Sequence, residues 1–264
     1  MEIRPPNKLN YPAVASMLTV ALGEPWDAEK LAGLIMADPL FDPNLVLMAR
    51  EKGEVLGFLS LVLSGETAWI KLIAVAPHYQ RKGLATEMLE RSEERGFGEG
   101  ARVFRAGFGP PPLFFPGVPE GAAAEFFKKH KYSLEPGGVV ARLAGQGKAA
   151  PANARAAKDL LAKVSPEWWT DIEERLTFTV PRCAMSADHK VLCVADPGSG
   201  IGPLFEAEAS DASIAEAVAG ALDLAQGSRL RDLRPSSWWK KRFELDQVCD
   251  CFEFKKDLRG ATSA

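Results

Sequence analysis

Apolar side chains along the first 145 residues recur with two different periods, and the period indicates which segments are helices and which are strands. Helices that face a core repeat their apolar positions every three or four residues, whereas half-buried strands alternate every second residue. The pattern predicts a mixed α/β (α+β) domain in the order strand, two helices, three strands, helix, strand, helix and strand. The predicted elements are residues 2–4, 11–22, 27–37, 44–50, 55–63, 68–75, 84–95, 103–106, 122–130 and 139–143.

Turn-forming residues separate these elements. Lys52, Gly53 and Glu54 stand between two runs rich in β-formers, which predicts a hairpin. Pro77 ends the strand 68–75, because proline cannot donate to a strand ladder. Residues 109–119 (GPPPLFFPGVP) contain so much proline and glycine that we expect an irregular loop there.

The last third of the chain has a pattern of its own. Residues 144–153 (AGQGKAAPAN) are small and polar, which is typical of a linker between a first domain, 1–145, and a second, 154–264. The second region is expected to form either a shortened repeat of the first or an unrelated accessory cap. Its predicted elements are a helix at 154–176, strands at 191–195 and 202–207, a helix at 213–225, a strand at 230–233, a helix at 237–243 and a strand at 250–255.

The chemically most informative segment joins the strand 68–75 to the helix 84–95. It reads Gln80-Arg81-Lys82-Gly83-Leu84-Ala85. A turn that opens a helix points several backbone N–H groups at one place, and the helix dipole and two cations add positive potential there. Such a turn suits phosphate or pyrophosphate, the alternative being a surface turn with two solvated cations. The spacing is neither that of the P-loop nor Gly-x-Gly-x-x-Gly.

With Val75-Ala76-Pro77 before it and a helix after it, this loop resembles the pyrophosphate loop of the GNAT acetyltransferase superfamily. The resemblance implies the GNAT fold, a central and mostly antiparallel sheet flanked by helices, followed by a smaller degenerate GNAT-like or accessory domain. It also implies transfer of an acetyl group from acetyl-CoA, or of another acyl group from its acyl-CoA, to a primary amine of a small molecule or peptide. The residues that it assigns to the cofactor are Ile73, Ala74, Val75, Gln80, Arg81, Lys82, Gly83, Leu84, Ala85, Thr86 and Phe127.

Two side chains that often serve catalysis in that family are missing at the matching positions. Many members carry a tyrosine in the late helix, where this chain has Phe127, and a glutamate on the fourth strand, where it has Trp69. Lys131 stands where the family usually has glycine. A phenylalanine can pack against a cofactor, but it cannot donate a proton.

The catalytic acid and base are therefore unknown from the sequence. Glu66 and Tyr79 are weak candidates, and His78 is a third titratable group beside the loop. For each, a structural or solvated role is the alternative. The missing residues also keep open a second interpretation, in which the chain is a non-catalytic acyl-CoA-binding protein with a sensor or regulatory function.

Composition limits the setting in which this chemistry takes place. Apolar residues make up 47% of the chain and charged residues 25%, which is typical of a globular protein in water. The net charge of −3 offers no broad basic field for nucleic acid, and no apolar run is long enough to cross a membrane. The N-terminus does not resemble a signal peptide. We therefore expect a cytoplasmic monomer or homodimer.

The four cysteines all lie late in the chain, at positions 183, 193, 249 and 251. Their spacing fits no zinc or redox motif, so no metal is expected. Reduced, buried thiols are the favoured interpretation, with disulfides as the alternative.

Overall fold

The computed structural model of the chain describes residues 1–23, 25–36, 38, 40–107, 117–143, 159–160, 163, 182–196, 200–225, 229–232, 236–243 and 245–258. It divides into two compact units. Unit 1 contains Met1–Gly109, Lys131–Ser133 and Phe254–Ala264, and unit 2 contains Pro110–His130 and Leu134–Glu253. The predicted linker 144–153 lies outside the described residues.

Unit 1 holds a sheet with the strand order β1-β2-β3-β4-β5-β12. All neighbouring pairs are antiparallel except β4 and β5, which are parallel. Two short 3-10 turns, Lys8–Asn10 and Pro43–Leu45, precede α1 and β2. The elements are β1 (Glu2–Arg4), α1 (Tyr11–Leu22), α2 (Ala28–Met36), β2 (Val46–Glu51), β3 (Glu54–Ser64), β4 (Thr67–Val75), α3 (Leu84–Gly98), β5 (Val103–Ala106) and β12 (Leu245–Asp257).

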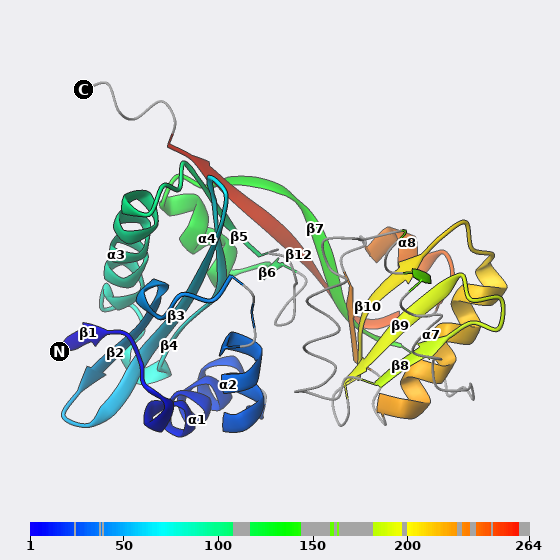
Figure 1. The fold of residues 1–264 in the computed structure, drawn as a ribbon, viewed down its shortest axis with the longest axis horizontal. Helices are drawn as coiled ribbons and strands as arrows, with labels where there is room; N and C mark the ends of the chain where they lie inside the picture. The colour runs from blue at the N-terminus through cyan, green and yellow to red at the C-terminus, as the bar shows by residue number, and fades with distance from the viewer. Residues whose placement is uncertain are drawn as a thin grey trace. The chain divides into compact units, whose positions relative to one another are not determined.

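Helices cover both faces of this sheet, with α3 on one face and α1 and α2 on the other (Figure 1). Two glycines let α3 approach closely. A Cβ atom at Gly57 of β3 would lie 2.7 Å from the sulfur of Met88, and one at Gly96 of α3 would lie 2.9 Å from the ring of Phe104. The face under α3 therefore tolerates no side chain at these two positions without a shift of its neighbours.

The C-terminal strand completes the sheet of unit 1. Residues Phe254 to Asp257 of β12 pair with Ala106 to Val103 of β5. Phe254 is fully buried, so this strand contributes to the core as well as to the ladder. Unit 1 is thus built from both ends of the chain.

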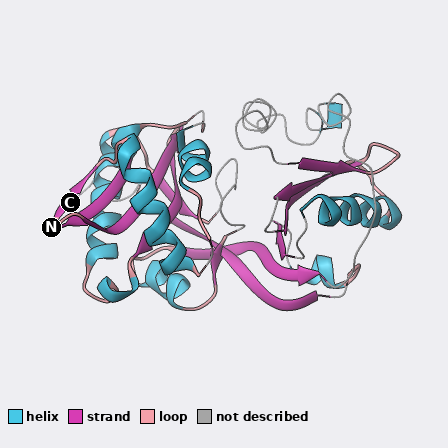
Figure 2. Ribbon diagram, turned by 90° about the horizontal axis from the view of Figure 1, so that it is seen from below, coloured by secondary structure: helices cyan, strands magenta, loops and turns pink. Residues whose placement is uncertain are grey.

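Unit 2 holds a second, smaller set of strands in the order β12-β7-β11-β10-β9-β8, in which β10 and β11 are parallel. α7 packs against β8, β9 and β10 (Figures 1 and 2). Trp239 is the largest fully buried side chain of its core. The elements are β6 (Val118–Pro119), α4 (Ala122–Lys129), β7 (Ser133–Leu143), β8 (Arg182–Met185), β9 (Val191–Asp196), β10 (Gly200–Glu206), α7 (Asp211–Ala225), β11 (Arg229–Asp232) and α8 (Ser236–Lys240).

The order of elements after residue 181 repeats the order between residues 46 and 143. Antiparallel strands β8, β9 and β10 are followed by α7, the parallel strand β11, α8 and β12, just as β2, β3 and β4 are followed by α3, β5, α4 and β7. This repetition favours the interpretation of the second region as a GNAT-like unit over an unrelated cap.

Most predicted elements are confirmed within one or two residues. α3 extends three residues further than predicted, to Gly98, and β7 begins at Ser133 rather than near 139. α8 ends at Lys240 rather than 243, and β12 begins at Leu245 rather than 250. The expectation of an irregular segment throughout 109–119 is wrong at its end, because Val118 and Pro119 pair with β12. The strand β8 was missed. The predicted helix 154–176 lies outside the described residues apart from 159, 160 and 163.

The cysteine prediction is confirmed for three of the four thiols. Cys193 and Cys251 are buried, Cys183 is partly buried, and none of these three thiols forms a disulfide. Burial raises the pKa of the Cys183 thiol to about 12. The side chain of Cys249 lies outside the described part. In the described chain, no helix has the length and apolar content needed to cross a membrane, and no group of His, Cys, Asp or Glu side chains could hold a metal ion.

Candidate functional site

The loop between β4 and α3 has the backbone geometry of an anion-binding turn. After the 3-10 turn Pro77–Tyr79, Arg81 adopts a φ of 62° and Gly83 a φ of 85°, and the intervening residue is not left-handed. Alternation of left-handed and right-handed residues makes successive N–H groups converge on one point, an arrangement known as a nest. Arg81, Lys82 and Gly83 are exposed, so the turn lies at the surface.

The first turn of α3 adds donors to the same loop. The first hydrogen bond of the helix joins Glu87 N to Gly83 O at 3.0 Å. The N–H groups of Leu84, Ala85 and Thr86 therefore precede the helix's own ladder and point back toward the loop. Together with the helix dipole, they favour a negatively charged group at this end of α3.

Gln80 shapes the loop. Its side-chain Nε2 donates to the backbone oxygen of Val75, 3.1 Å away. This hydrogen bond joins the end of β4 to the start of the turn and so fixes where the nest lies relative to the strand. Gln80 was predicted to contact the cofactor, and its observed bond shows that its amide nitrogen has a local partner.

The aromatic and basic side chains near the loop contact one another. Lys82 Nζ lies 4.7 Å from the centroid of the Tyr79 ring, a cation–π distance. His78 packs edge-on to Tyr79, and its Nε2 lies 3.3 Å from a carboxylate oxygen of Glu54, with both of these side chains largely exposed. Tyr79 is thus placed to hold Lys82 beside the nest. Its candidacy as a catalytic group stays a prediction.

Before β4 reaches the loop, its pairing with β5 ends. Their parallel ladder runs from Thr67 opposite Val103 to Ile70 opposite Ala106 and ends there. β4 continues against β3 as far as Val75, which pairs with Gly57. We call the point just beyond Ile70 the fork. From the fork to Val75, no described strand pairs with β4 on its β5 side.

This open edge contains Ile73, Ala74 and Val75, the strand residues predicted to bind the cofactor. An extended ligand can hydrogen-bond to such an edge as an added strand would. Because the edge ends at Val75 and the nest begins six residues later, at Arg81, one extended ligand with an anionic end could use both. The structure therefore brings together the strand and loop residues that the sequence had grouped.

Other predicted site residues lie elsewhere. Glu66 is exposed in the turn before β4, at the end of the strand away from the nest, and its backbone oxygen accepts from the N–H groups of Arg102 and Val103. Phe127 is buried on α4 in unit 2, with its ring 5.3 Å from that of Phe126. Its contact with a cofactor stays a prediction.

Trp69 and Lys71 lie on either side of the fork. The guanidinium of Arg105 on β5 lies 5.3 Å from the Trp69 ring, so the position where the family often has glutamate carries a cation–π pair. Lys71 Nζ lies 3.5 Å from a carboxylate oxygen of Asp38, and both side chains are buried. This pair was not predicted from the sequence, although a lysine within the apolar run TAWIKLIAV is an unusual residue for a buried strand.

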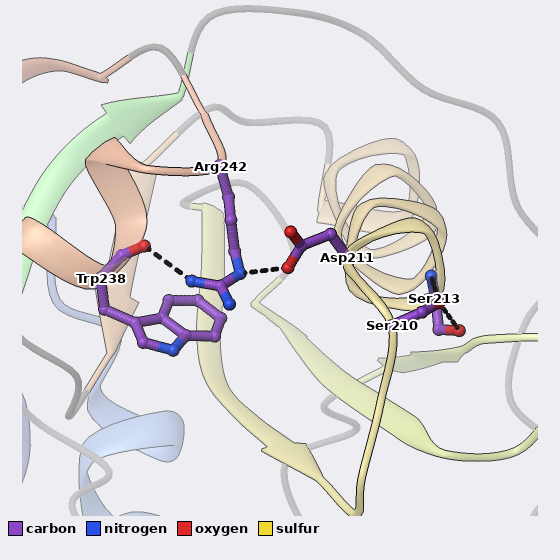
Figure 3. A network of polar contacts seen from close by, with 5 residues as sticks. All are labelled: Ser210, Asp211, Ser213, Trp238 and Arg242. Carbon is purple, nitrogen blue, oxygen red and sulfur yellow. Dashed lines mark hydrogen bonds and ion pairs between the residues drawn. The ribbon is translucent and has the colours of Figure 1, made fainter.

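The corresponding turn of unit 2 is occupied by the chain's own side chains. Ser210 Oγ accepts from the N–H of Ser213 at the start of α7 (Figure 3). Ser213 Oγ in turn donates to Asp188 Oδ2 at 2.7 Å. Hydrogen bonds from Ser186 and Ser213 lower the pKa of the Asp188 carboxyl, which keeps it ionised near the helix end.

A second carboxylate lies at the start of α7. Asp211 Oδ1 accepts from Arg242 Nε at 2.7 Å, and the guanidinium stacks on Trp238 at 4.1 Å (Figure 3). With Asp188 and Asp211 near this helix end, a phosphate would meet like charge. The turn of unit 2 is therefore unsuited to binding an anion, in contrast to the nest of unit 1.

A comparison with known protein families identifies the part of the chain that holds this loop. Residues 12–109 match the family described as the acetyltransferase (GNAT) family. No curated protein matches the chain significantly.

Solved structures resemble the chain over nearly its full length. A candidate acetyltransferase of Pyrococcus horikoshii has a TM-score of 0.70 at 17% identity, covering 97% of this chain and 89% of its own. A GCN5-related N-acetyltransferase of Sphaerobacter thermophilus has a TM-score of 0.63 at 14% identity, covering 98% and 96%. A tandem GNAT protein from the clavulanic acid biosynthesis pathway has a TM-score of 0.62 at 14% identity, covering 97% and 98%. At these identities the likeness shows the fold alone.

Proposed function

We propose that this chain, whose residues 12–109 form a domain of the acetyltransferase (GNAT) family, moves an acyl group from an acyl-CoA to a primary amine. We infer acetyl-CoA as the donor and a small molecule or peptide as the acceptor. The observation that carries the proposal is the continuity of the nest with the open edge of β4. Unit 2 shows no comparable turn in its described part, so we assign the donor site to unit 1 alone.

The nest would hold the pyrophosphate of the donor. Backbone N–H groups from Arg81 to Thr86 and the positive end of the α3 dipole supply the donors. Lys82, held against Tyr79, and Arg81 add positive potential at the exposed rim. Screening by salt should weaken the contribution of these two exposed cations more than that of the backbone.

The open edge of β4 would hold the extended pantetheine arm. Backbone groups of Ile73 to Val75 can pair with its amides as a neighbouring strand would. An arm that follows this edge from the nest leads toward the fork. The thioester would then lie at the fork, where the β4–β5 ladder ends, on the side of the sheet that α1 and α2 cover.

Transfer requires the amine nitrogen to attack the thioester carbon, so that a C–N bond forms and the C–S bond breaks. The attacking amine must be neutral, and water can carry away its proton. Placing the two reactants within about 3–3.5 Å of each other supplies much of the rate enhancement. A backbone N–H of the open edge aimed at the carbonyl oxygen would stabilise the oxyanion.

One observation favours a second candidate function, a non-catalytic acyl-CoA-binding protein. Neither Phe127 nor Trp69 can transfer a proton, and the Trp69 ring is paired with Arg105. A sensor needs the nest and the edge but no proton-transfer groups.

Two measurements on the full chain separate the candidates. Calorimetric titration with acetyl-CoA tests donor binding, and thiol release from acetyl-CoA in the presence of a panel of primary amines tests transfer. The enzyme proposal predicts saturable binding and amine-dependent thiol release. Binding without release on any amine would support the binding protein, and absence of binding would contradict both.

A further inference from the structure

The pair of Lys71 and Asp38 is buried, and the proposed binding of the donor does not use it. Lys71 Nζ lies 3.5 Å from Asp38 Oδ2, and each side chain is only 3% exposed. By comparison, the pair of His78 with Glu54 is largely exposed, and that of Lys256 with Glu93 is only partly buried. A lysine and an aspartate at this degree of burial are unusual in a protein core.

Stability alone does not account for such a pair. Removing two charges from water costs several kcal/mol per ion, and a well-packed apolar pair of similar volume is often as stable or more stable. The neighbours of Lys71 on β4, Ile70 and Leu72, are buried apolar residues, so the site could have been filled in that way. We therefore look for a functional reason why Lys71 and Asp38 are charged.

Lys71 occupies a special position in the sheet. The β4–β5 ladder ends at Ile70. The pairing of β3 with β4 shifts register at the same place. Ser60 pairs with Leu72, and the next residue, Leu61, pairs with Ile70. Lys71 is therefore the extra residue of a β-bulge. Bulges redirect a side chain and are common next to active sites. Lys71 is thus the first residue of β4 beyond the fork.

Asp38 reaches this position from the segment after α2, which ends at Met36. Its Oδ1 accepts from the N–H of Leu40 at 3.0 Å, and its backbone oxygen accepts from Phe41 N at 2.8 Å. These bonds fix the carboxylate so that Oδ2 faces Lys71. The pair therefore lies on the α1–α2 side of the fork, whereas the nest opens at the start of α3.

We propose that Lys71 stabilises the negative charge that develops on the thioester during transfer, and that Asp38 is the positioning residue that holds the ammonium at the fork. This inference rests on the proposed function. In the step, the amine lone pair forms the C–N bond, and the C–S electron pair leaves on sulfur. The proton lost by the amine goes to water, and Lys71 keeps its own proton throughout. A fixed cation in a site of low polarity acts more strongly on such charge than it would in water.

The test uses the double variant Lys71→Met with Asp38→Asn, which removes both charges at similar volume, together with Lys71→Met and Lys71→Arg alone. Acetyl-CoA is the donor and hydroxylamine, which is uncharged at neutral pH, is the nucleophile. A matched control removes the exposed pair of Lys128 and Glu125 in the same way (Lys128→Met with Glu125→Gln). Thermal unfolding, the calorimetric Kd for acetyl-CoA and the rate of thiol release are measured for each protein.

We expect the double variant to remain folded and to bind acetyl-CoA with a Kd within about twofold of the wild type, while its transfer rate falls at least about tenfold. Lys71→Arg should retain more activity than Lys71→Met, and the control should match the wild type. Three results would overturn the inference: a double variant with the wild-type rate, one that loses stability and affinity in proportion to rate, or one that does not fold. If the wild type binds acetyl-CoA without releasing thiol on any nucleophile, the proposed enzyme function fails and takes this inference with it.

Discussion

The Lys256 ammonium lies 2.6 Å from Glu93 Oε2, an ion pair that joins the last strand of the chain to the third helix across 163 positions of sequence. The other oxygen of Glu93 accepts from the Tyr132 hydroxyl at 2.8 Å. One partly buried carboxylate thus fastens two later segments to the helix whose N-terminus forms the proposed donor site. Burial and the neighbouring Glu93 carboxylate also raise the pKa of Tyr132 far above its ordinary value.

Replacing Glu93 with glutamine should destabilise the protein. The amide cannot offer two charge-assisted acceptors, and a lost hydrogen bond to a charged group costs about 1.5–3 kcal/mol. The measurement is the free energy of unfolding in urea. Glu94→Gln, an exposed neighbour on the same helix, is the matched control and should change stability by less than about 0.5 kcal/mol. Equal effects of the two changes would show that the ion pair does not hold β12.

A fragment of residues 1–145 should fold poorly by itself. It contains every helix and strand predicted for the first domain, but it lacks Phe254 to Asp257, which pair with β5 and bury Phe254. The exposed edge of β5 should also promote aggregation. Circular dichroism during urea unfolding is the measurement. A fragment that unfolds cooperatively and binds acetyl-CoA as the full chain does would contradict the role given to β12.

Replacing Lys131 with glycine should make the protein more stable. Its φ of 65° just after α4 is left-handed, which costs an L-residue roughly 1–2 kcal/mol. Part of the gain is lost because glycine has more freedom in the unfolded chain, so Lys131→Gly should stabilise by up to about 1 kcal/mol. Lys129→Gly, within the helix, should destabilise by roughly 0.5–1 kcal/mol. Changes of the same sign at both positions would contradict this explanation.

Stability should decrease in alkali partly because of Cys183. Its thiol titrates near 9.0 when unperturbed and near 12 in the folded chain. Between these values the unfolded state binds fewer protons than the folded state, so the free energy of unfolding falls as the pH rises, by up to about 1.4 kcal/mol per unit. Unfolding measured at pH 9 and 10 should show a smaller fall for Cys183→Ala than for the wild type. Equal falls would show that this thiol does not contribute.

Much of unit 1 was predictable from sequence because its signals are local. The hairpin at Lys52 and Gly53 follows from turn chemistry, and both residues have positive φ as that turn requires. The loop from Gln80 to Ala85 was recognisable because glycine, cations and a following helix occur together. Lys131 shows a further local signal, since the family's glycine position keeps its left-handed backbone even with a lysine in place.

What the sequence could not predict depends on partners far along the chain. The pairing of Phe254 with Ala106 joins segments 148 residues apart, and no local pattern records it. The same holds for Glu93 with Lys256 and for Lys71 with Asp38, because an ion pair is defined only once both elements are placed. Gln80 was expected at the cofactor, and only the folded loop shows that its amide bonds to Val75.

The central claim, that the nest at the start of α3 binds the pyrophosphate of acyl-CoA, is tested by a pair of glycine variants. Gly83 and Gly53 have similar φ angles, 85° and 93°, and an added Cβ would meet nothing within 4 Å at either position. Gly83→Glu and Gly53→Glu therefore impose similar strain, but only the first puts a carboxylate into the nest. Calorimetric titration with acetyl-CoA should give wild-type affinity for Gly53→Glu and a loss of at least about 100-fold for Gly83→Glu, roughly 2.7 kcal/mol. Equal affinity in the two variants would contradict the account.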